Sequence, residues 1–213
     1  MTLIHAAGTS EAHYPAERAT VTARISIASR DRARSIAEAT ALHNRIARRA
    51  QELRTAGDAT WHSAEPISTA TRKSFAEGSK TKVVIEHVTA STVRIKLSNL
   101  GIVGEVVAEL AAAGAETRVD WSLTERFKRQ CEREARRAAV NDARDVAEDY
   151  AAALGERIGR VVSVSDAHAA HGGAPMRAGS AAGSEAQITI AEITVRASVK
   201  GEFETSGHSA AEQ

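Results

Sequence analysis

One segment of the chain, from Arg126 to Leu154, contains neither glycine nor proline and is rich in alanine. Glycine and proline are the residues that most often interrupt or end helices, and Gly155 stands where a left-handed cap would end this one. The valine-rich run 161–164 then indicates a strand. The segment therefore predicts one long helix that leads into a strand, and it constrains the fold more than any other part of the sequence.

Periodicity and caps indicate further helices and strands on both sides of this segment. Strands are expected at residues 20–28, 60–70, 82–97, 116–123, 161–165 and 187–204. Helices are expected at 32–54, after the N-cap residue Asp31, and at about 102–113, after Ser98 or Asn99. The polar residues 71–81 predict a turn or loop. In the last strand, the apolar side chains change from one face to the other near Ala191 and Glu192, which predicts a bulge or a bend.

This order of elements predicts an α+β fold, with a two-layer arrangement of long helices packed on a mainly antiparallel sheet and two βαβ-like halves. We expect a single domain over residues 1–204, with halves at approximately 1–98 and 99–204. Residues 167–186 are rich in Ala, Gly, Ser and His and are expected to form a flexible loop. Residues 205–213 are expected to be a disordered tail.

The composition argues against several classes of protein. The formal net charge is +1 and aromatic residues make up 3%, so neither a general electrostatic attraction to nucleic acid nor a set of stacking platforms is expected. The one cysteine, Cys131, cannot form an intramolecular disulfide, and no window is apolar enough to cross a bilayer. The N-terminus lacks the pattern of a signal peptide, so we expect a cytoplasmic protein, or a periplasmic one if the chain is a processed form.

The long helix carries the most specific motif of the chain, Ala135-Arg136-x-x-Ala139-x-x-Asp142-Ala143-Arg144-x-x-Ala147-x-x-Tyr150-Ala151-x-x-Leu154-Gly155-x-x-Ile158-Gly159. Supporting elements are Gly8 and Pro15 before the first predicted strand, the pair Gly114-Ala115, and the terminal run 193–199. Taken in this order, these elements resemble the SIMPL-domain family of bacterial proteins over nearly all of residues 4–204.

The resemblance implies an α+β protein that self-associates, in some relatives into large rings, with a link to stress tolerance or surface antigenicity. No catalytic residue is established for that family, so the resemblance implies none in this chain. The chain departs from the family pattern at Glu192, where many relatives have proline. It also lacks the secretion signal that is typical of periplasmic relatives.

Two ionisable residues are candidates for a buried polar site, because the sequence places both on apolar sides of helices. His43 lies on the apolar side of the helix 32–54, and Asp142 lies within the apolar stripe of the long helix. That stripe comprises Phe127, Cys131, Ala135, Ala138, Val146 and Ala153. A buried carboxylate is costly unless it is paired, so Asp142 is either a general acid or base with a raised pKa or, as we favour, a side chain held by a backbone donor or an arginine. His43 is expected to be a satisfied core or interface histidine.

An arginine stripe is predicted on the opposite side of the long helix. Its members are Arg126, Arg133, Arg137 and Arg144, with Arg129 and Arg136 beside them. Such a stripe can contact phosphates, form an oligomer interface or simply face solvent. We favour a solvated face over nucleic-acid binding, because the net charge is close to zero and Arg144 can pair with Glu148 one turn later.

No cofactor and no metal site are expected. His168 and His171 lie in the predicted loop, whereas a metal site needs several ligands that converge on a rigid frame. Cys131 lies on the packed side of the long helix, where a thiol is usually inert.

The leading hypothesis is a non-enzymatic protein that acts through self-assembly or through binding an unknown protein partner. Homo-oligomerisation is expected because an unpaired edge strand and an alanine-rich helix both allow close association. The alternatives are a small-ligand or metal binder or enzyme with a cleft near Asp142, and a weak nucleic-acid binder that uses the arginine stripe.

Overall fold

The computed structural model describes residues 1–75, 83–167 and 188–206, and these residues form two compact units. Among them, unit 1 consists of residues 1–15, 124–167 and 192–206, and unit 2 consists of the remainder. The expected α+β class is confirmed, but the strands form two mostly antiparallel sheets rather than one. Each unit combines segments that are not consecutive in the chain.

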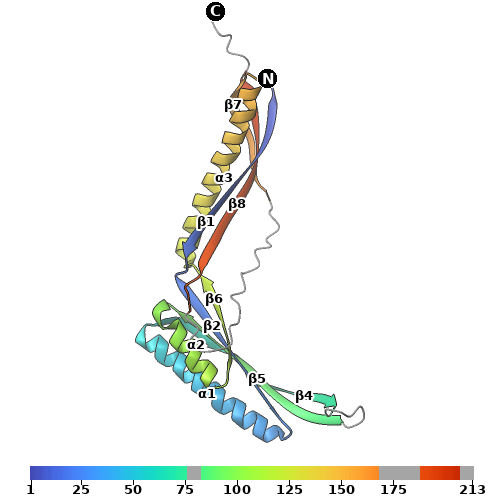
Figure 1. Ribbon diagram of the computed structural model, residues 1–213, viewed down its shortest axis with the longest axis vertical. Coiled ribbons are helices and arrows are strands. Elements are labelled where there is room, and N and C mark those ends of the chain that lie inside the picture. The colour runs from blue at the N-terminus through green and yellow to red at the C-terminus, as the bar shows by residue number, and fades with distance from the viewer. Residues whose placement is uncertain (76–82, 168–187, 207–213) are drawn as a thin grey trace, which may run out of the picture. The chain divides into compact units, whose positions relative to one another are not determined.

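Unit 1 is a three-stranded antiparallel sheet with one long helix against it (Figure 1). Its elements are β1 (Leu3–Pro15), α3 (Glu125–Ala153), β7 (Arg157–Asp166) and β8 (Glu192–Ser206), with strand order β1-β8-β7. The prediction of the long helix and of the strand after it is confirmed. The first strand, β1, was not predicted, although Ile4, Ala6 and Gly8 alternate with more exposed residues and are buried.

The core of unit 1 lies between small residues of α3 and larger residues of the sheet. The helix buries a row of residues spaced four apart, namely Cys131, Ala135, Ala139, Ala143, Ala147 and Ala151. The sheet contributes Ile4, Val199 and Phe203, of which Phe203 is 1% exposed. The predicted apolar stripe is confirmed at Cys131 and Ala135, which are buried, but it is wrong at Ala138, Asp142 and Ala153, which are exposed. Because an α-helix has 3.6 residues per turn, a row of residues spaced exactly four apart winds slowly around the helix. Here the row follows the twist of the strands that it packs on.

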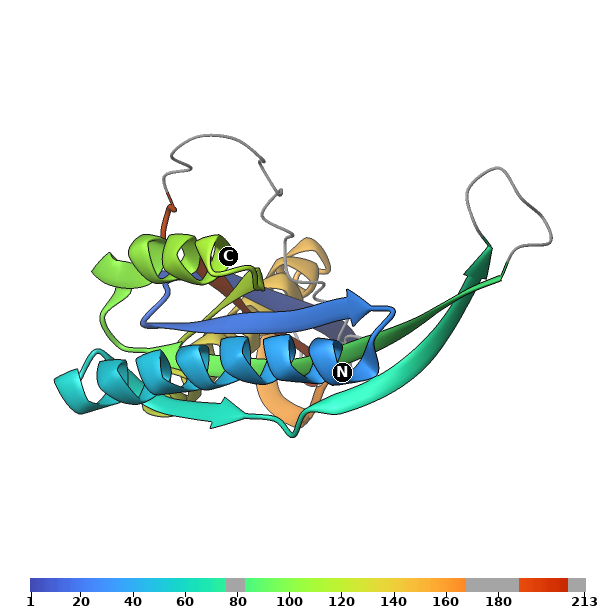
Figure 2. The ribbon, with the colours of Figure 1, turned by 90° about the horizontal axis from the view of Figure 1, so that it is seen from below.

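Unit 2 is a sheet with strand order β3-β5-β2-β6, to which β4 is added by pairing with β5. Its elements are β2 (Arg18–Ser29), α1 (Arg32–Ala56), β3 (Ala59–Ala64), β4 (Ser68–Phe75), β5 (Val83–Leu97), the 3-10 turn η1 (Leu100–Ile102), α2 (Val103–Ala112) and β6 (Glu116–Ser122). Both helices share one apolar core with β2 and β5. The turn predicted over residues 71–81 begins too early, because Thr71 to Phe75 belong to β4. Figure 2 shows β4 and β5 continuing together past the end of β2.

The helix ends of unit 2 follow the local signals of the sequence. The Asp31 side chain accepts hydrogen bonds from the backbone N–H groups of Ala33 and Arg34, at 2.8 and 3.3 Å, and so caps α1. Gly57 ends the same helix with φ of 87°, a conformation that favours glycine. Asn99 caps η1 by accepting from the N–H of Gly101 at 3.2 Å. The predicted cap at Asp31 is thus confirmed, whereas Asn99 caps η1 and not α2, whose N-cap residue Ile102 makes no side-chain hydrogen bond.

The C-terminal predictions are tested only in part. Most of the predicted loop 167–186 and most of the predicted tail lie outside the described residues, although β8 continues to Ser206. The strand expected from residue 187 begins at Glu192. The change in the alternation of apolar side chains near Ala191 therefore marks the start of the strand and not a bulge within it. Among the helices described, none has the length and apolar character to span a membrane.

Candidate functional site

Asp142 contacts β1 within unit 1, at a point where the strand lies very close to α3. Gly8 faces the helix so closely that a Cβ atom there would overlap the carbonyl oxygen of Ala139 and the backbone nitrogen of Ala143. The next residue, Thr9, donates its backbone N–H to Oδ2 of Asp142 at 2.7 Å. Asp142 is exposed, so the predicted buried site at this position is wrong, but a backbone donor does hold the carboxylate, as the favoured interpretation expected.

His43 lies in unit 2 and is half-buried between α1 and the sheet. Its Nδ1 atom lies 2.8 Å from the hydroxyl oxygen of Ser91 on β5. The neighbouring hydroxyls of Ser35 and Thr89, both buried, lie 2.7 Å apart, and Ser35 also donates to the carbonyl of Ile27 at 3.0 Å. These contacts satisfy polar groups inside the unit, which is the role expected for His43. The structure does not bring His43 and Asp142 into one site, since they belong to different units.

Tyr14 and Phe127 form a small aromatic cluster, in which Tyr14 lies beside the buried thiol of Cys131. The rings of Tyr14 and Phe127 meet edge to face, with centroids 5.5 Å apart. Burial, the Cys131 thiol and the Glu134 carboxylate raise the pKa of Tyr14 above its ordinary value. The cluster holds the end of β1 against the first turns of α3. Sequence analysis missed Tyr14, because its strand was not predicted.

The four arginines of the predicted stripe are all exposed on α3. Their positions along the helix place them within about 40° of one another around its axis, so they share one side of α3. The predicted pair of Arg144 and Glu148 is present, with Nε and Oε1 2.8 Å apart.

The outer strand of unit 1, β7, exposes a cluster of valines. Val161, Val162 and Val164 are 51%, 47% and 46% exposed. β7 is an edge strand, because its only partner among the described strands is β8. The sequence predicted a strand here, but it could not show that this strand lies at the edge of a sheet.

The sheet face of unit 1 that lies away from α3 is polar and crossed by ion pairs. Arg196 on β8 donates to both carboxylate oxygens of Glu11 on β1, at 2.8 and 3.0 Å, and this hydrogen bonding lowers the pKa of Glu11. Glu202 accepts from Ser163 at 3.0 Å, and its other oxygen lies 3.6 Å from His5. A shallow hollow of about 390 Å³ lies beside these residues. Among the side chains that line it, those of His5 and Ser163 both contact Glu202.

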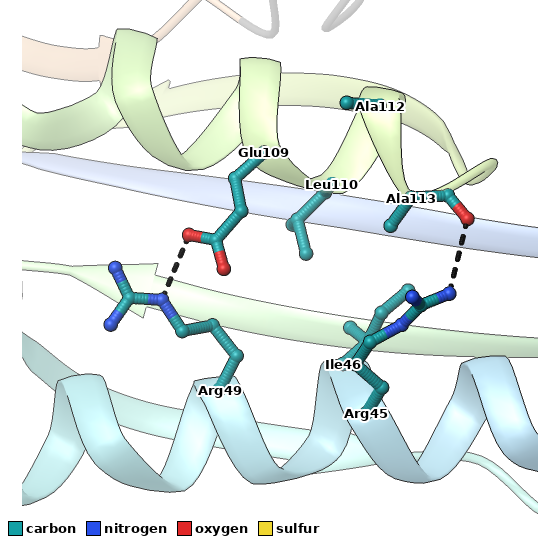
Figure 3. A pocket seen from close by; sticks show the side chains of 7 residues that line it. All are labelled: Arg45, Ile46, Arg49, Glu109, Leu110, Ala112 and Ala113. Atoms are coloured by element: carbon teal, nitrogen blue, oxygen red, sulfur yellow. Dashed lines mark hydrogen bonds and ion pairs between the residues drawn. The ribbon is translucent and has the colours of Figure 1, made fainter.

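A second shallow hollow, of about 300 Å³, lies between α1 and α2 of unit 2 (Figure 3). Arg49 pairs with Glu109 across it at 2.8 Å, and Arg45 donates to the carbonyl of Ala113 at 3.4 Å. The side chains that line the hollow therefore join the two helices. In the described part of the chain, no three His, Cys, Asp or Glu side chains converge as metal ligands, and His168 and His171 lie outside that part.

The comparisons with known proteins point to one family. Residues 4–203 match the family model SIMPL, described as a protein of unknown function (DUF541). The match covers nearly the whole chain and agrees with the resemblance carried by the motif on α3. A search of curated proteins finds no match.

Proposed function

The chain belongs to the SIMPL family, and from this premise we propose that it acts without catalysing a reaction, by associating with further copies of itself or with a protein partner. The observation that carries this proposal is the exposed apolar edge of β7. An open strand edge offers unpaired backbone N–H and C=O groups, and apolar side chains beside it make pairing with another chain favourable.

The second half of β7 is the part best suited to such pairing. The first half contains two exposed arginines, Arg157 and Arg160, and the pairing with β8 is irregular up to Ser163. Charges and irregular pairing both hinder the addition of a strand. From Ser163 to Asp166 the pairing with β8 is regular, and Val164 projects from this stretch with about half of its surface exposed.

Sedimentation velocity and light scattering over a wide range of concentration test this proposal. We expect the wild-type protein to self-associate, and we expect Val162→Lys/Val164→Lys to weaken the association by at least about tenfold, because burial of even one valine is worth more than a factor of ten. Ile36→Lys is the matched control: Ile36 is 37% exposed on α1 of unit 2, whereas β7 belongs to unit 1, and its replacement should leave the association unchanged. A wild-type protein that stays monomeric at its highest soluble concentration, and binds no protein partner in pull-down from its own cells, would contradict the proposal.

No observation favours the alternative functions over this one. Asp142 is exposed, binds the backbone of β1, and lines neither of the two hollows described above. The arginine-rich half of α3 is followed by an acidic half, which would repel phosphates. We also propose a role in stress tolerance, supported by the family resemblance alone. Survival of a deletion strain under oxidative and heat stress tests that role.

A further inference from the structure

The strands β4 and β5 continue past the end of β2 as a two-stranded arm (Figure 2). β5 pairs with β2 only as far as His87, whereas its pairing with β4 continues to Val83. We call the paired residues 72–75 and 83–86 the arm. Within the described structure, no strand lies against residues 83–86 on the side away from β4. These residues therefore form an open strand edge, with backbone N–H and C=O groups that a further strand can bind.

The base of the arm is held by buried hydroxyl groups. Thr89 on β5 is buried, and its Oγ1 lies 2.7 Å from Oγ of Ser35 on α1 and 3.0 Å from Oγ1 of Thr69 on β4. Arg72 pairs with Glu86 across the arm itself at 2.8 Å. A two-stranded ribbon is only marginally stable in water without a third strand or a packing surface. The arm is thus fixed where it leaves the sheet, and a third strand would stabilise it beyond that point.

The two edges of the arm differ in chemistry. The edge formed by β4 carries Arg72 and Lys73, both exposed, and charged side chains on an edge strand discourage pairing. The edge formed by β5 has the sequence Val-Val-Ile-Glu over residues 83–86, and Ile85 is 50% exposed. β-branched aliphatic residues favour strand pairing. The arm is therefore protected along β4 and open along β5.

Of the other outer strands in the described structure, only β7 presents a comparable apolar edge. β1 lies against α3, and its Thr9 N–H group is bound by Asp142. β3 is short, and β6 carries the ion pair of Arg118 with Asp120. β7 exposes Val164 in the stretch that pairs regularly with β8. Each copy therefore offers two open apolar edges, one on the arm and one on β7.

We propose that residues 83–86 of the arm pair with residues 163–166 of β7 in a second copy, as antiparallel strands. The two stretches have the same length, and this register sets Ile85 directly opposite Val164. Residues directly opposite each other on neighbouring strands are in contact, so the two half-exposed aliphatic side chains bury each other. The inference deepens the proposed self-association, because it names the surface that β7 binds, and it rests on that proposal.

Other pairings of these edges are less favourable. A parallel arrangement of the same two stretches places Glu86 beside Asp166, so that like charges meet. It also sets Ile85 opposite Ser165 and loses the aliphatic pair. Pairing of β7 with β7 of a second copy covers that edge but leaves the arm open. Pairing of the arm with β7 covers both edges with one kind of contact, and it joins copies in series because each copy has one of each edge.

Mixing two full-length variants tests the inference. Ile85→Glu removes the exposed aliphatic side chain of the arm, and the new carboxylate lies opposite Lys73, so the arm should keep its fold. Val162→Lys/Val164→Lys blocks β7. We expect each variant alone to self-associate at least about tenfold more weakly than the wild type. In an equimolar mixture, the intact arm of the β7 variant can bind the intact β7 of the arm variant, so sedimentation should show heterodimers of wild-type affinity and no larger species.

Ser68→Glu is the matched control for the arm. It changes the net charge as Ile85→Glu does, but Ser68 is exposed at the start of β4, outside the arm. This variant should self-associate as the wild type does. Circular dichroism confirms that each variant is folded.

Disulfide formation between two cysteine variants measures the register. Ile85→Cys and Val164→Cys each add one thiol at an exposed position, whereas the native Cys131 is fully buried. Directly opposite residues on paired strands lie within the Cα separation that a disulfide requires. A mixture of these two variants under mild oxidation should give a linked heterodimer. Ile85→Cys mixed with Ser165→Cys should link far less, and equal linking would overturn the antiparallel register.

The outcomes separate this inference from the proposal on which it rests. If the wild type self-associates and Ile85→Glu does so equally, or if the mixture behaves as the separate variants do, the contact of the arm with β7 is wrong and the proposed function stands. If the wild type stays monomeric but captures a protein partner in pull-down, the inference is wrong and the proposed function again stands. If the wild type does neither, both are wrong.

Discussion

At the scale of single residues, Gly8 and Asp142 explain why β1 lies so close to α3. Gly8 permits the backbone of β1 to approach Ala139 and Ala143, because any Cβ atom would overlap the helix backbone. Asp142 accepts the N–H of Thr9, a group on the edge strand that would otherwise need water. A carboxylate that sequence analysis considered as a general acid or base thus supports a strand.

Gly8→Ala should destabilise the protein. The added methyl group meets backbone atoms that cannot move independently, so we expect a loss of at least about 1–3 kcal/mol, as for other overpacked sites. Gly104→Ala is the control, because nothing lies within 4 Å of a Cβ atom there and alanine favours helix α2. Chemical denaturation of both variants gives the free energies of unfolding. Equal stability of Gly8→Ala and the wild type would show that β1 is not tightly packed on α3.

At the scale of elements, strand pairing between β1 and β8 joins the two ends of the described chain. The register runs from Leu3 opposite Glu204 to Pro15 opposite Glu192. Polar pairs support it on the solvent face, and the strongest of these is the bidentate contact of Arg196 with Glu11. The lowered pKa of Glu11 makes this contact dependent on pH.

Glu11→Gln should reduce stability at neutral pH and have little effect in acid. A carboxyl group whose pKa is lower in the folded state stabilises the fold above its ordinary pKa of 4.5, and this contribution is lost as pH falls through the lower folded-state value. The melting temperatures of the variant and the wild type should therefore converge well below that pH. Glu192→Gln, at the start of β8, is a control for the loss of an exposed carboxylate. A difference that is unchanged in acid would argue against the ion pair.

At the scale of the whole molecule, two separate apolar cores support the chain. The core of unit 2 is formed by aliphatic side chains of the helices α1 and α2 and the sheet, whereas the core of unit 1 combines alanines of α3 with Val199 and Phe203. The ring of Phe203 also covers Gly201 on the same face of β8. Each core therefore holds its own set of strands and helices.

Phe203→Ala should open unit 1 selectively. Removal of a fully buried phenylalanine costs about 3–5 kcal/mol and leaves a cavity against the alanine row of α3. Hydrogen exchange measured by mass spectrometry should accelerate in β1, β7 and β8 and change little in β2 and β5. Uniform acceleration in both units would show instead that the two cores unfold together.

The sequence by itself determined the class of the fold, the family and the bounds of most helices. Caps and breakers act within a few residues, so Asp31, Gly57 and the segment from Arg126 to Leu154 could be interpreted without knowledge of the fold. The pair of Arg144 and Glu148 was predictable for the same reason. The arginine stripe could likewise be inferred from the spacing of the arginines, once the long helix was predicted.

Only the tertiary structure decided which strands pair and which side of the long helix is buried. The partners of β1 and β7 lie in β8, which is remote from β1 in the sequence, so no local pattern identifies them. The strands form two sheets, and the two units interleave along the chain, where consecutive halves at 1–98 and 99–204 were expected. The buried row of α3 follows twisted strands, and this contact leaves Asp142 exposed. Burial depends on contacts between distant residues, and those contacts exist only once the chain has folded.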